Sequence, residues 1–198
     1  MIPNFIKLKI PTESGLLDVR PMLNRLQETD PKVWREDTYL RDFPQGPFGD
    51  TESIILRFPP RTVKETMKEL EDYNSKVDEH ENVWQPCAKD FPEFKSVVFE
   101  LAYKLEATRI GRVMINKLNN KGRVFPHADT PSHAKYWSRF HVVVGALPGV
   151  DFRTGDEWVQ MTTGEIWFFN NELEHEVINN SGQPRIHMII DLKIEHLK

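Results

Sequence analysis

Three polar residues in the C-terminal half of the chain have the types and spacing of a metal site. His127 and Asp129 stand two positions apart, and His175 follows well downstream. Alternate residues of an extended segment project from the same face, so one segment can present His127 and Asp129 to one metal. Two imidazoles and one carboxylate leave coordination positions open, which suits Fe(II) oxygen chemistry better than a closed zinc site. The sequence therefore predicts His127, Asp129 and His175 as catalytic metal ligands.

The pair alone is a weak signal, because the chain has seven histidines and most histidines lie at the surface or in a hydrogen-bonded core. A downstream arginine strengthens it. Alternation along the last apolar segment places Arg185 on the same face as His187 and Asp191. A buried guanidinium needs an anion, and the distal carboxylate of 2-oxoglutarate is a suitable bidentate partner. The alternative is an ion pair between Arg185 and a carboxylate of the protein.

A second segment carries an arginine and a histidine in the same alternating pattern. Arg139 and His141 share a face with Val143. Both side chains could contact the carboxylates of the cosubstrate, so both are predicted to bind it. A buried, hydrogen-bonded histidine in the core is an equally good interpretation of His141.

The elements that must position these residues change in kind along the chain. Helical patterns prevail before residue 106, and short strands separated by turn signals follow. Helices followed by strands favour a single domain, 1–198, that is mainly β with flanking helices. It would have a helical and irregular flank over 1–106 and a double-stranded β-helix (jelly roll, cupin-like) over 107–198. The expected helices are a short one within 12–26, 62–73 and 91–105, and the expected strands are 53–58, 108–118, 140–147, 157–161, 165–169 and 185–192.

Composition is that of an ordinary globular domain. The chain has 198 residues, 39% hydrophobic and 28% charged, with a net charge of −4. Without a broad basic field, nucleic acid is not an expected partner. The single cysteine, Cys87, excludes an internal disulfide and is expected to be an inert, packed thiol. No signal peptide or membrane-length apolar run is visible, so a cytoplasmic protein without a membrane partner is expected.

The motifs around these residues resemble the aspartyl/asparaginyl β-hydroxylase-like family of Fe(II)/2-oxoglutarate oxygenases. The resemblance covers roughly residues 108–193, and Asp129 makes the chain more similar to the bacterial branch that includes proline cis-4-hydroxylase. The animal protein-modifying members lack a carboxylate after the first histidine. The matching motifs are Pro126-His127, Arg139-x-His141, Gly164-Glu165-Ile166-Trp167-Phe168, Glu174-His175-Glu176 and Arg185-x-His187-Met188-Ile189-Ile190-Asp191.

The resemblance implies a dioxygenase that uses Fe(II), 2-oxoglutarate and O2, with ascorbate sustaining activity. Iron would bind His127, Asp129 and His175, and 2-oxoglutarate would bind Arg185 with help from Arg139. The expected substrate is a free amino acid or a similar small metabolite. Two alternatives stay open: hydroxylation of Asp, Asn or another residue in a protein or peptide, and a noncatalytic jelly-roll binding module. Arg109, Arg112, Trp137 and Arg153 are candidates for substrate contact, although packing or surface pairing explains each of them more simply.

Overall fold

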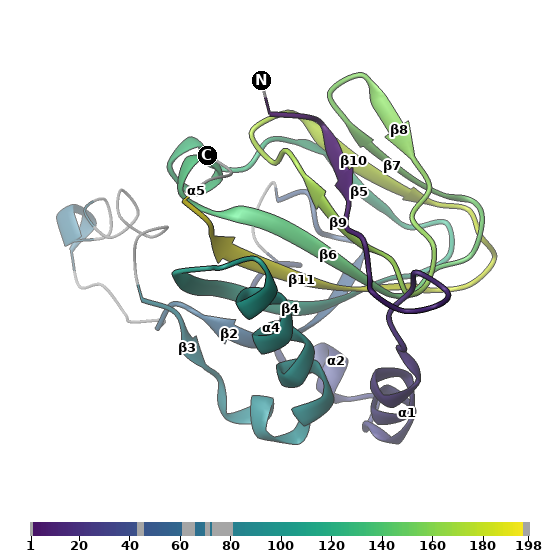
Figure 1. Cartoon of the computed structure of the whole chain (residues 1–198). Helices are drawn as coiled ribbons and strands as arrows, with labels where there is room; N and C mark the ends of the chain where they lie inside the picture. Colours follow the sequence, from purple (N-terminus) through teal and green to yellow (C-terminus); the bar gives the residue numbers. More distant parts are fainter. Residues whose placement is uncertain (1, 43–45, 61–65, 70–71, 73–80, 196–198) are drawn as a thin grey trace.

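Two antiparallel sheets make up most of the structure. The computed structural model describes residues 2–42, 46–60, 66–69, 72 and 81–195, and Figure 1 shows how the strands are arranged. Within this part, the larger sheet has the spatial order β1 (Phe5–Lys7), β9 (Ile166–Phe169), β6 (Ser138–Gly145), β11 (Arg185–Lys193), β4 (Arg109–Leu118), β2 (Thr51–Phe58) and β3 (Val83–Trp84). The smaller sheet has the order β5 (Arg123–His127), β10 (His175–Asn179), β7 (Val150–Thr154) and β8 (Glu157–Val159).

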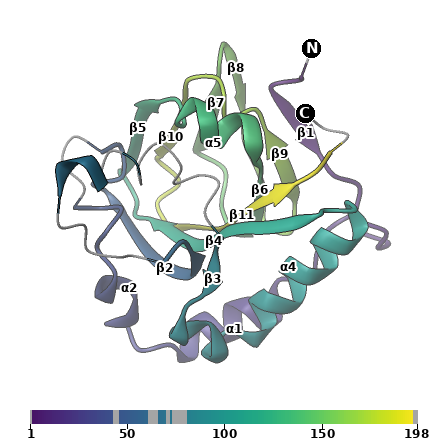
Figure 2. The ribbon, with the colours of Figure 1, turned by 90° about the vertical axis from the view of Figure 1, so that its left-hand side faces the viewer.

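Helices cover the outer face of the larger sheet. Figure 2 shows α1 (Arg20–Glu28) and α4 (Pro92–Lys104) lying beneath it. Apolar residues of α4 recur at three- and four-residue steps, so Phe94, Val98 and Leu101 are all buried against the sheet. This contact forms the main hydrophobic core. Short helical elements in the described part include α2 (Val33–Glu36), η1 (Pro86–Asp90, a 3-10 helix) and α5 (Pro131–Tyr136).

The inner face of the larger sheet meets the smaller sheet. A second apolar cluster contains Val143 and Phe169 from the larger sheet and Phe152 and Val177 from the smaller one. Strand residues alternate between the two faces. On β6, for example, Val142 faces the helices while its neighbours face inward. The chain is thus a mainly β jelly roll, as predicted, with its polar residues aimed between the sheets.

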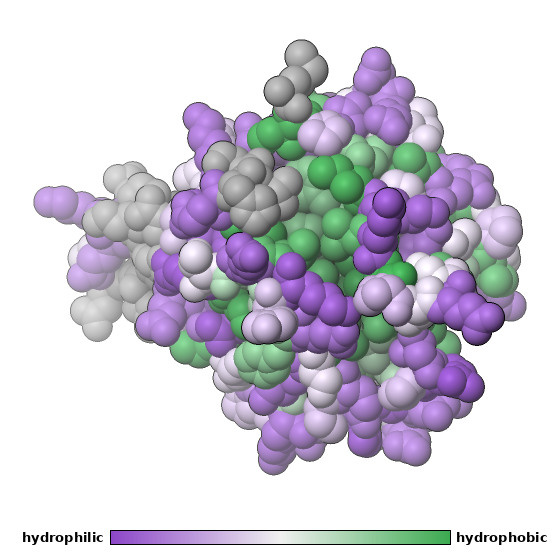
Figure 3. Space-filling model, viewed as in Figure 1, coloured by the Kyte–Doolittle hydropathy of each residue, from purple (hydrophilic) through white to green (hydrophobic). Residues whose placement is uncertain are grey.

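A shallow apolar groove marks the outer face. It lies between the segment after β1 and α4 and has a volume of about 290 Å³. Figure 3 shows apolar side chains gathered on this face. Ile166, which lines the groove, belongs to the core on the helix side of the sheet. The groove is therefore separated by the larger sheet from the inward-facing polar residues.

Several predicted elements are confirmed, with small shifts at their ends. The strands expected at 53–58, 108–118, 140–147, 157–161, 165–169 and 185–192 correspond to β2, β4, β6, β8, β9 and β11, and the helix at 91–105 corresponds to α4. The short helix expected within 12–26 is α1, which begins at Arg20 and runs on to Glu28. Of the helix expected over 62–73, only residues 66–69 and 72 lie in the described part, so this prediction falls mostly outside it.

The structure differs from the expected division at residue 106. β1, β2 and β3 come from the first 106 residues, yet they belong to the larger sheet. β1 pairs with β9 and β2 pairs with β4, so the N-terminal part completes the sheet as well as covering it. Cys87 is half-buried, its thiol contacts the carbonyl oxygen of Ile55, and burial raises its pKa, in keeping with an inert thiol. Among the described residues, no helix has the length and apolarity needed to cross a membrane.

Candidate metal centre

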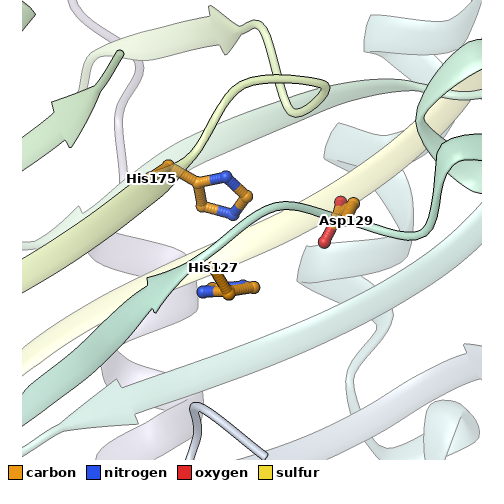
Figure 4. Close-up of side chains that lie close together, drawn as sticks. All are labelled: His127, Asp129 and His175. Carbon is orange, nitrogen blue, oxygen red and sulfur yellow. The ribbon is translucent and has the colours of Figure 1, made fainter. Parts of the chain in front are cut away.

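Two neighbouring strands of the smaller sheet bring the predicted histidines together. β5 ends at His127 and β10 begins at His175, and the two residues are directly paired in the register. Their ring centroids lie 4.2 Å apart. Asp129 follows two residues after the end of β5, and the ligand atoms of all three side chains lie within 4.8 Å of one another. Figure 4 shows the three side chains pointing toward one common region.

The backbone fixes the orientation of both imidazoles. His127 Nδ1 donates to the carbonyl oxygen of Phe125 at 2.8 Å, and His175 Nδ1 donates to that of Leu173 at 2.9 Å. A proton held on Nδ1 leaves Nε2 with its lone pair for a metal. The Nε2 atom of His127 is buried and has no hydrogen-bond partner in the described structure. A buried ring nitrogen of this kind, with its lone pair available, fits a metal ligand.

Burial keeps both imidazoles neutral. It lowers the pKa of His127 below the ordinary value of 6.5. Burial, together with the repulsion that two neighbouring protonated imidazoles would feel, lowers the pKa of His175 to about 4. Neutral imidazole is the form that binds metal, so neither ring has to lose a proton near pH 7.

Asp129 is held as a carboxylate. Burial raises its pKa, but the charge of Arg139 and the nearby histidines outweigh this and lower the pKa below 3.8. Arg139 Nη1 lies 2.7 Å from Asp129 Oδ2, and Asn171 Nδ2 donates to the same oxygen at 2.8 Å. The site thus offers two neutral nitrogens and one anionic oxygen, the donor set that suits non-haem Fe(II).

Arg139 lies beside the metal ligands and is engaged by carboxylates of the protein. Its Nε lies 2.8 Å from Asp191 Oδ1 and its Nη2 lies 3.1 Å from Asp191 Oδ2. His133 Nε2 also lies 3.0 Å from Asp191 Oδ2. Arg139, Asp191 and His133 are buried, and Asp129 is nearly so. The arginine predicted to contact the cosubstrate is therefore placed in a protein ion-pair network next to Asp129.

Arg185 has different surroundings. It is 2% exposed, and no carboxylate pairs with it among the described residues. Its Nη2 lies 2.7 Å from His187 Nδ1 and 3.3 Å from His141 Nδ1, while its Nε is buried without a partner. Burial lowers the pKa of Arg185 to about 9. A buried, unpaired guanidinium with an orphaned donor fits an incoming carboxylate.

His141 lies between Arg185 and the cluster of His127, Asp129 and His175. Its ring lies 5.0 Å from Phe169, and the Phe169 ring lies 5.0 Å from His175. Burial, followed by the charges of Arg185 and Arg139, lowers the pKa of His141 well below 6.5. Arg185, His141 and the candidate metal ligands therefore line one interior, with aromatic rings between them.

The residues considered for substrate contact are engaged elsewhere. Trp137 is buried at 1% exposure, and Arg109 Nη1 donates to the hydroxyl of Tyr136 at 2.7 Å. Arg153 pairs with Glu174 and Glu176 on the smaller sheet, and Arg112 lies over the ring of Phe58. Sequence reasoning did not identify Asn171 and His133 as part of the site. Neither belongs to a periodic pattern, and only their buried polar character in the structure reveals them.

Facing sheets with a His, Asp, His cluster at adjacent strand ends define a jelly-roll protein with a candidate metal centre. The chain matches the model of the aspartyl/asparaginyl beta-hydroxylase family over residues 65–194, about two thirds of its length, and belongs to this family.

One relative and several solved structures are similar to the chain. It is 28% identical over 108 residues to the L-proline cis-4-hydroxylase of Rhizobium meliloti (strain 1021), a match that covers 54% of this chain and 38% of that relative. A 2OG-Fe(II) oxygenase family oxidoreductase from Burkholderia pseudomallei is 14% identical, covers 72% of this chain and 66% of its own, and has a TM-score of 0.44. A cupin domain from Bordetella pertussis is 19% identical, with 43% and 84% covered and a TM-score of 0.35.

Proposed function

We propose that the protein is an Fe(II)- and 2-oxoglutarate-dependent dioxygenase that hydroxylates a free amino acid or a similar small metabolite. One observation carries the proposal above the others. An oriented His127, Asp129, His175 cluster shares an interior with a buried guanidinium, Arg185, that no described protein carboxylate neutralises. A noncatalytic metal-binding module would not need the buried guanidinium of Arg185.

Each residue has a separate task in this proposal. His127, Asp129 and His175 would hold Fe(II), and Arg185 would bind the C5 carboxylate of 2-oxoglutarate through charge-assisted hydrogen bonds. When bound, iron and 2-oxoglutarate supply the oxidising chemistry, in which O2 is consumed, the cosubstrate becomes succinate and CO2, and the substrate gains a hydroxyl group. The chain itself contributes the binding, the orientation and the exclusion of water.

The surroundings of His141 support a positioning task for it. The ring is 4% exposed, lies between Arg185 and the aromatic wall of Phe152 and Phe169, and is neutral at pH 7 because burial lowers its pKa. A neutral ring adds no positive charge beside Arg185 or the metal. We propose that His141 contributes a hydrogen bond to the bound cosubstrate while the aromatic rings exclude water.

The proposed substrate class is supported by the relative named as an L-proline cis-4-hydroxylase, at low identity and over part of its length. The family as a whole is described by Asp and Asn hydroxylation, which keeps a residue in a protein or peptide as the second candidate. The two candidates differ in what must reach the interior: a single small molecule or an extended chain.

The proposal is tested by a screen for substrate-stimulated succinate formation. The purified chain would be given Fe(II), ascorbate, O2 and 2-oxoglutarate, with each of the common amino acids and a set of short peptides containing the same residues. Stimulation by one free amino acid, and not by peptides that contain it, is the expected result. Stimulation by peptides alone would select the protein-modifying alternative. Absence of Fe(II) binding would overturn the proposal in favour of a noncatalytic module.

A further inference from the structure

Within the described part of the chain, the side-chain contacts of the Asp129 carboxylate are made through one of its oxygens. Arg139 Nη1 and Asn171 Nδ2 approach it at 2.7 and 2.8 Å, and both contacts are made to Oδ2. A carboxylate oxygen with two strong donors has little lone-pair density left for a metal, whereas Oδ1 keeps its own. From this geometry we infer that Arg139 and Asn171 are positioning residues that set Asp129 to bind the metal through Oδ1. The inference rests on the proposed metal site.

The arginine that holds Asp129 is itself fixed. Arg139 on β6 and Asp191 on β11 are direct partners in the register of the larger sheet, and they are joined by two contacts at 2.8 and 3.1 Å. His133, from α5, lies 3.0 Å from the same carboxylate and 2.9 Å from Arg139 Nη2. Asp191 is fully buried, and Arg139 is 6% exposed. A rigid strand pair therefore sets where the end of the guanidinium lies, and this end sets the rotation of Asp129.

Asn171 donates to the same carboxylate oxygen of Asp129 that Arg139 contacts. It is fully buried just after β9, and its backbone oxygen accepts a hydrogen bond from the Asp129 amide at 3.3 Å. Its side chain donates to Asp129 Oδ2 at the same time. Asp129, which follows β5, is thus hydrogen-bonded to Asn171, which follows β9, through both its main chain and its side chain. An amide can do this because it donates without adding charge, whereas a carboxylate at position 171 would repel Asp129.

The same contacts separate the tasks of the two interior arginines. Nε and both Nη atoms of Arg139 already contact Asp191, Asp129 and His133, so all three nitrogens of its guanidinium have partners. Arg185 lies near neutral imidazoles and keeps an orphaned Nε. Arg139 therefore serves the metal carboxylate, and Arg185 serves the cosubstrate. This assignment replaces the expectation that Arg139 assists in binding 2-oxoglutarate.

Two separate measurements distinguish these tasks. The first is the affinity of the chain for Mn(II) or anaerobic Fe(II), measured by calorimetry without 2-oxoglutarate. The second is the KM for 2-oxoglutarate at saturating metal. Residues that orient metal ligands typically change metal affinity by about 10- to 100-fold when they are removed. We expect Arg139→Gln and Asn171→Ala to weaken metal binding in this range and to leave the KM for 2-oxoglutarate within about twofold. Arg185→Met should do the reverse.

Two further variants keep the test decisive if Arg139→Gln folds poorly. Arg139→Lys retains a charge that can reach one carboxylate, and it should recover part of the metal affinity. Asn171→Asp keeps the size of the side chain and should weaken metal binding more than Asn171→Ala. Unchanged metal affinity in folded Arg139 and Asn171 variants, with the wild type binding metal, would overturn this inference alone. A rise in the KM for 2-oxoglutarate in Arg139→Gln at saturating metal would also overturn it. A wild type that binds no divalent metal would overturn the proposed function itself.

Discussion

Arg185 is expected to reduce the stability of the protein in exchange for its function. The change to examine is Arg185→Met, which keeps a long flexible side chain and removes the charge. The guanidinium is 2% exposed and has no described carboxylate partner. In the absence of cosubstrate, the folded state therefore holds a charge that water solvates better in the unfolded state. The variant should be more stable than the wild type and unable to bind 2-oxoglutarate.

The magnitude follows from the pKa. Burial lowers the pKa of Arg185 from 12.5 to about 9, which corresponds to a cost of about 5 kcal/mol for the charged form. The folded state has the lower pKa, so this cost is fully present at every pH below about 9. Methionine loses the contacts to His187 and His141, worth about 1 kcal/mol each, and packs imperfectly, at about another 1 kcal/mol. The expected net gain in the free energy of unfolding is about 2 kcal/mol.

Urea denaturation of the metal-free protein measures this gain, and 2-oxoglutarate-dependent thermal stabilisation of the metal-loaded protein measures the loss of binding. Arg153→Met is the matched control. That arginine is paired with Glu174 and Glu176, which raise its pKa, so the same substitution should not stabilise. The reasoning is refuted if Arg185→Met is less stable than the wild type by more than about 1 kcal/mol, or if 2-oxoglutarate still stabilises it.

Four other outcomes are expected. His175→Ala should abolish Fe(II) binding while the circular dichroism spectrum stays that of a folded β protein; normal affinity would sink the ligand assignment. Asp129→Gly should weaken Fe(II) binding sharply, and unchanged affinity in a calorimetric titration would show that Asp129 is not a metal ligand. Because burial lowers the pKa values of His141 and His187, and that of His175 to about 4, the folded metal-free protein binds fewer protons than the unfolded chain. Its stability should therefore fall as pH drops below about 6.5, by up to roughly 1.4 kcal/mol per pH unit for each histidine, and a flat urea midpoint over this range would contradict the burial argument. Cys87→Ser should leave the rate of succinate formation unchanged, and a lower rate in this variant would contradict the expectation of an inert thiol.

The proximity of the three proposed metal ligands could be predicted from the sequence, because part of the pattern is local. A His-x-Asp pair on an extended segment presents both side chains on one side, and the structure places His127 and Asp129 with their ligand atoms close to those of His175. The pattern did not predict the strands β5, β7 and β10, the last of which begins at His175 itself. Glu176 and Asn179 interrupt the apolar pattern there, because both are polar and yet buried.

The environment of the arginines could not be predicted, because it depends on register between distant strands. Arg139 and Arg185 both alternate inward, so the sequence makes Arg185 the expected anchor of 2-oxoglutarate and Arg139 its helper. In the sheet, Asp191 lies opposite Arg139, while Leu118 lies opposite Arg185. One arginine therefore receives a carboxylate and the other does not. A register shift between Ile186 and His187 also contributes to this difference, and no single-sequence pattern reveals such a shift.

The strands β1 and β3 escaped prediction for a different reason. β1 is three residues long and β3 is two, so neither is long enough to show alternation. β1 forms the edge of the larger sheet because its backbone pairs with β9, with Phe5 opposite Phe169. The ring of Phe5 also packs edge-on against Phe152 of the smaller sheet. Partners of this kind are known only once the fold brings the ends of the chain together.

The central claim is that His127, Asp129 and His175 bind Fe(II) and that Arg185 binds 2-oxoglutarate beside it. The most direct test is an anaerobic titration of Fe(II) into the protein with 2-oxoglutarate present, followed by the visible charge-transfer absorption of the Fe(II)–2-oxoglutarate chelate. The account predicts a band that saturates at equimolar iron in the wild type and is lost in His175→Ala. In Arg185→Met, the band should require a much higher concentration of 2-oxoglutarate. A wild type without the band, or a His175→Ala variant that retains it, would contradict the account.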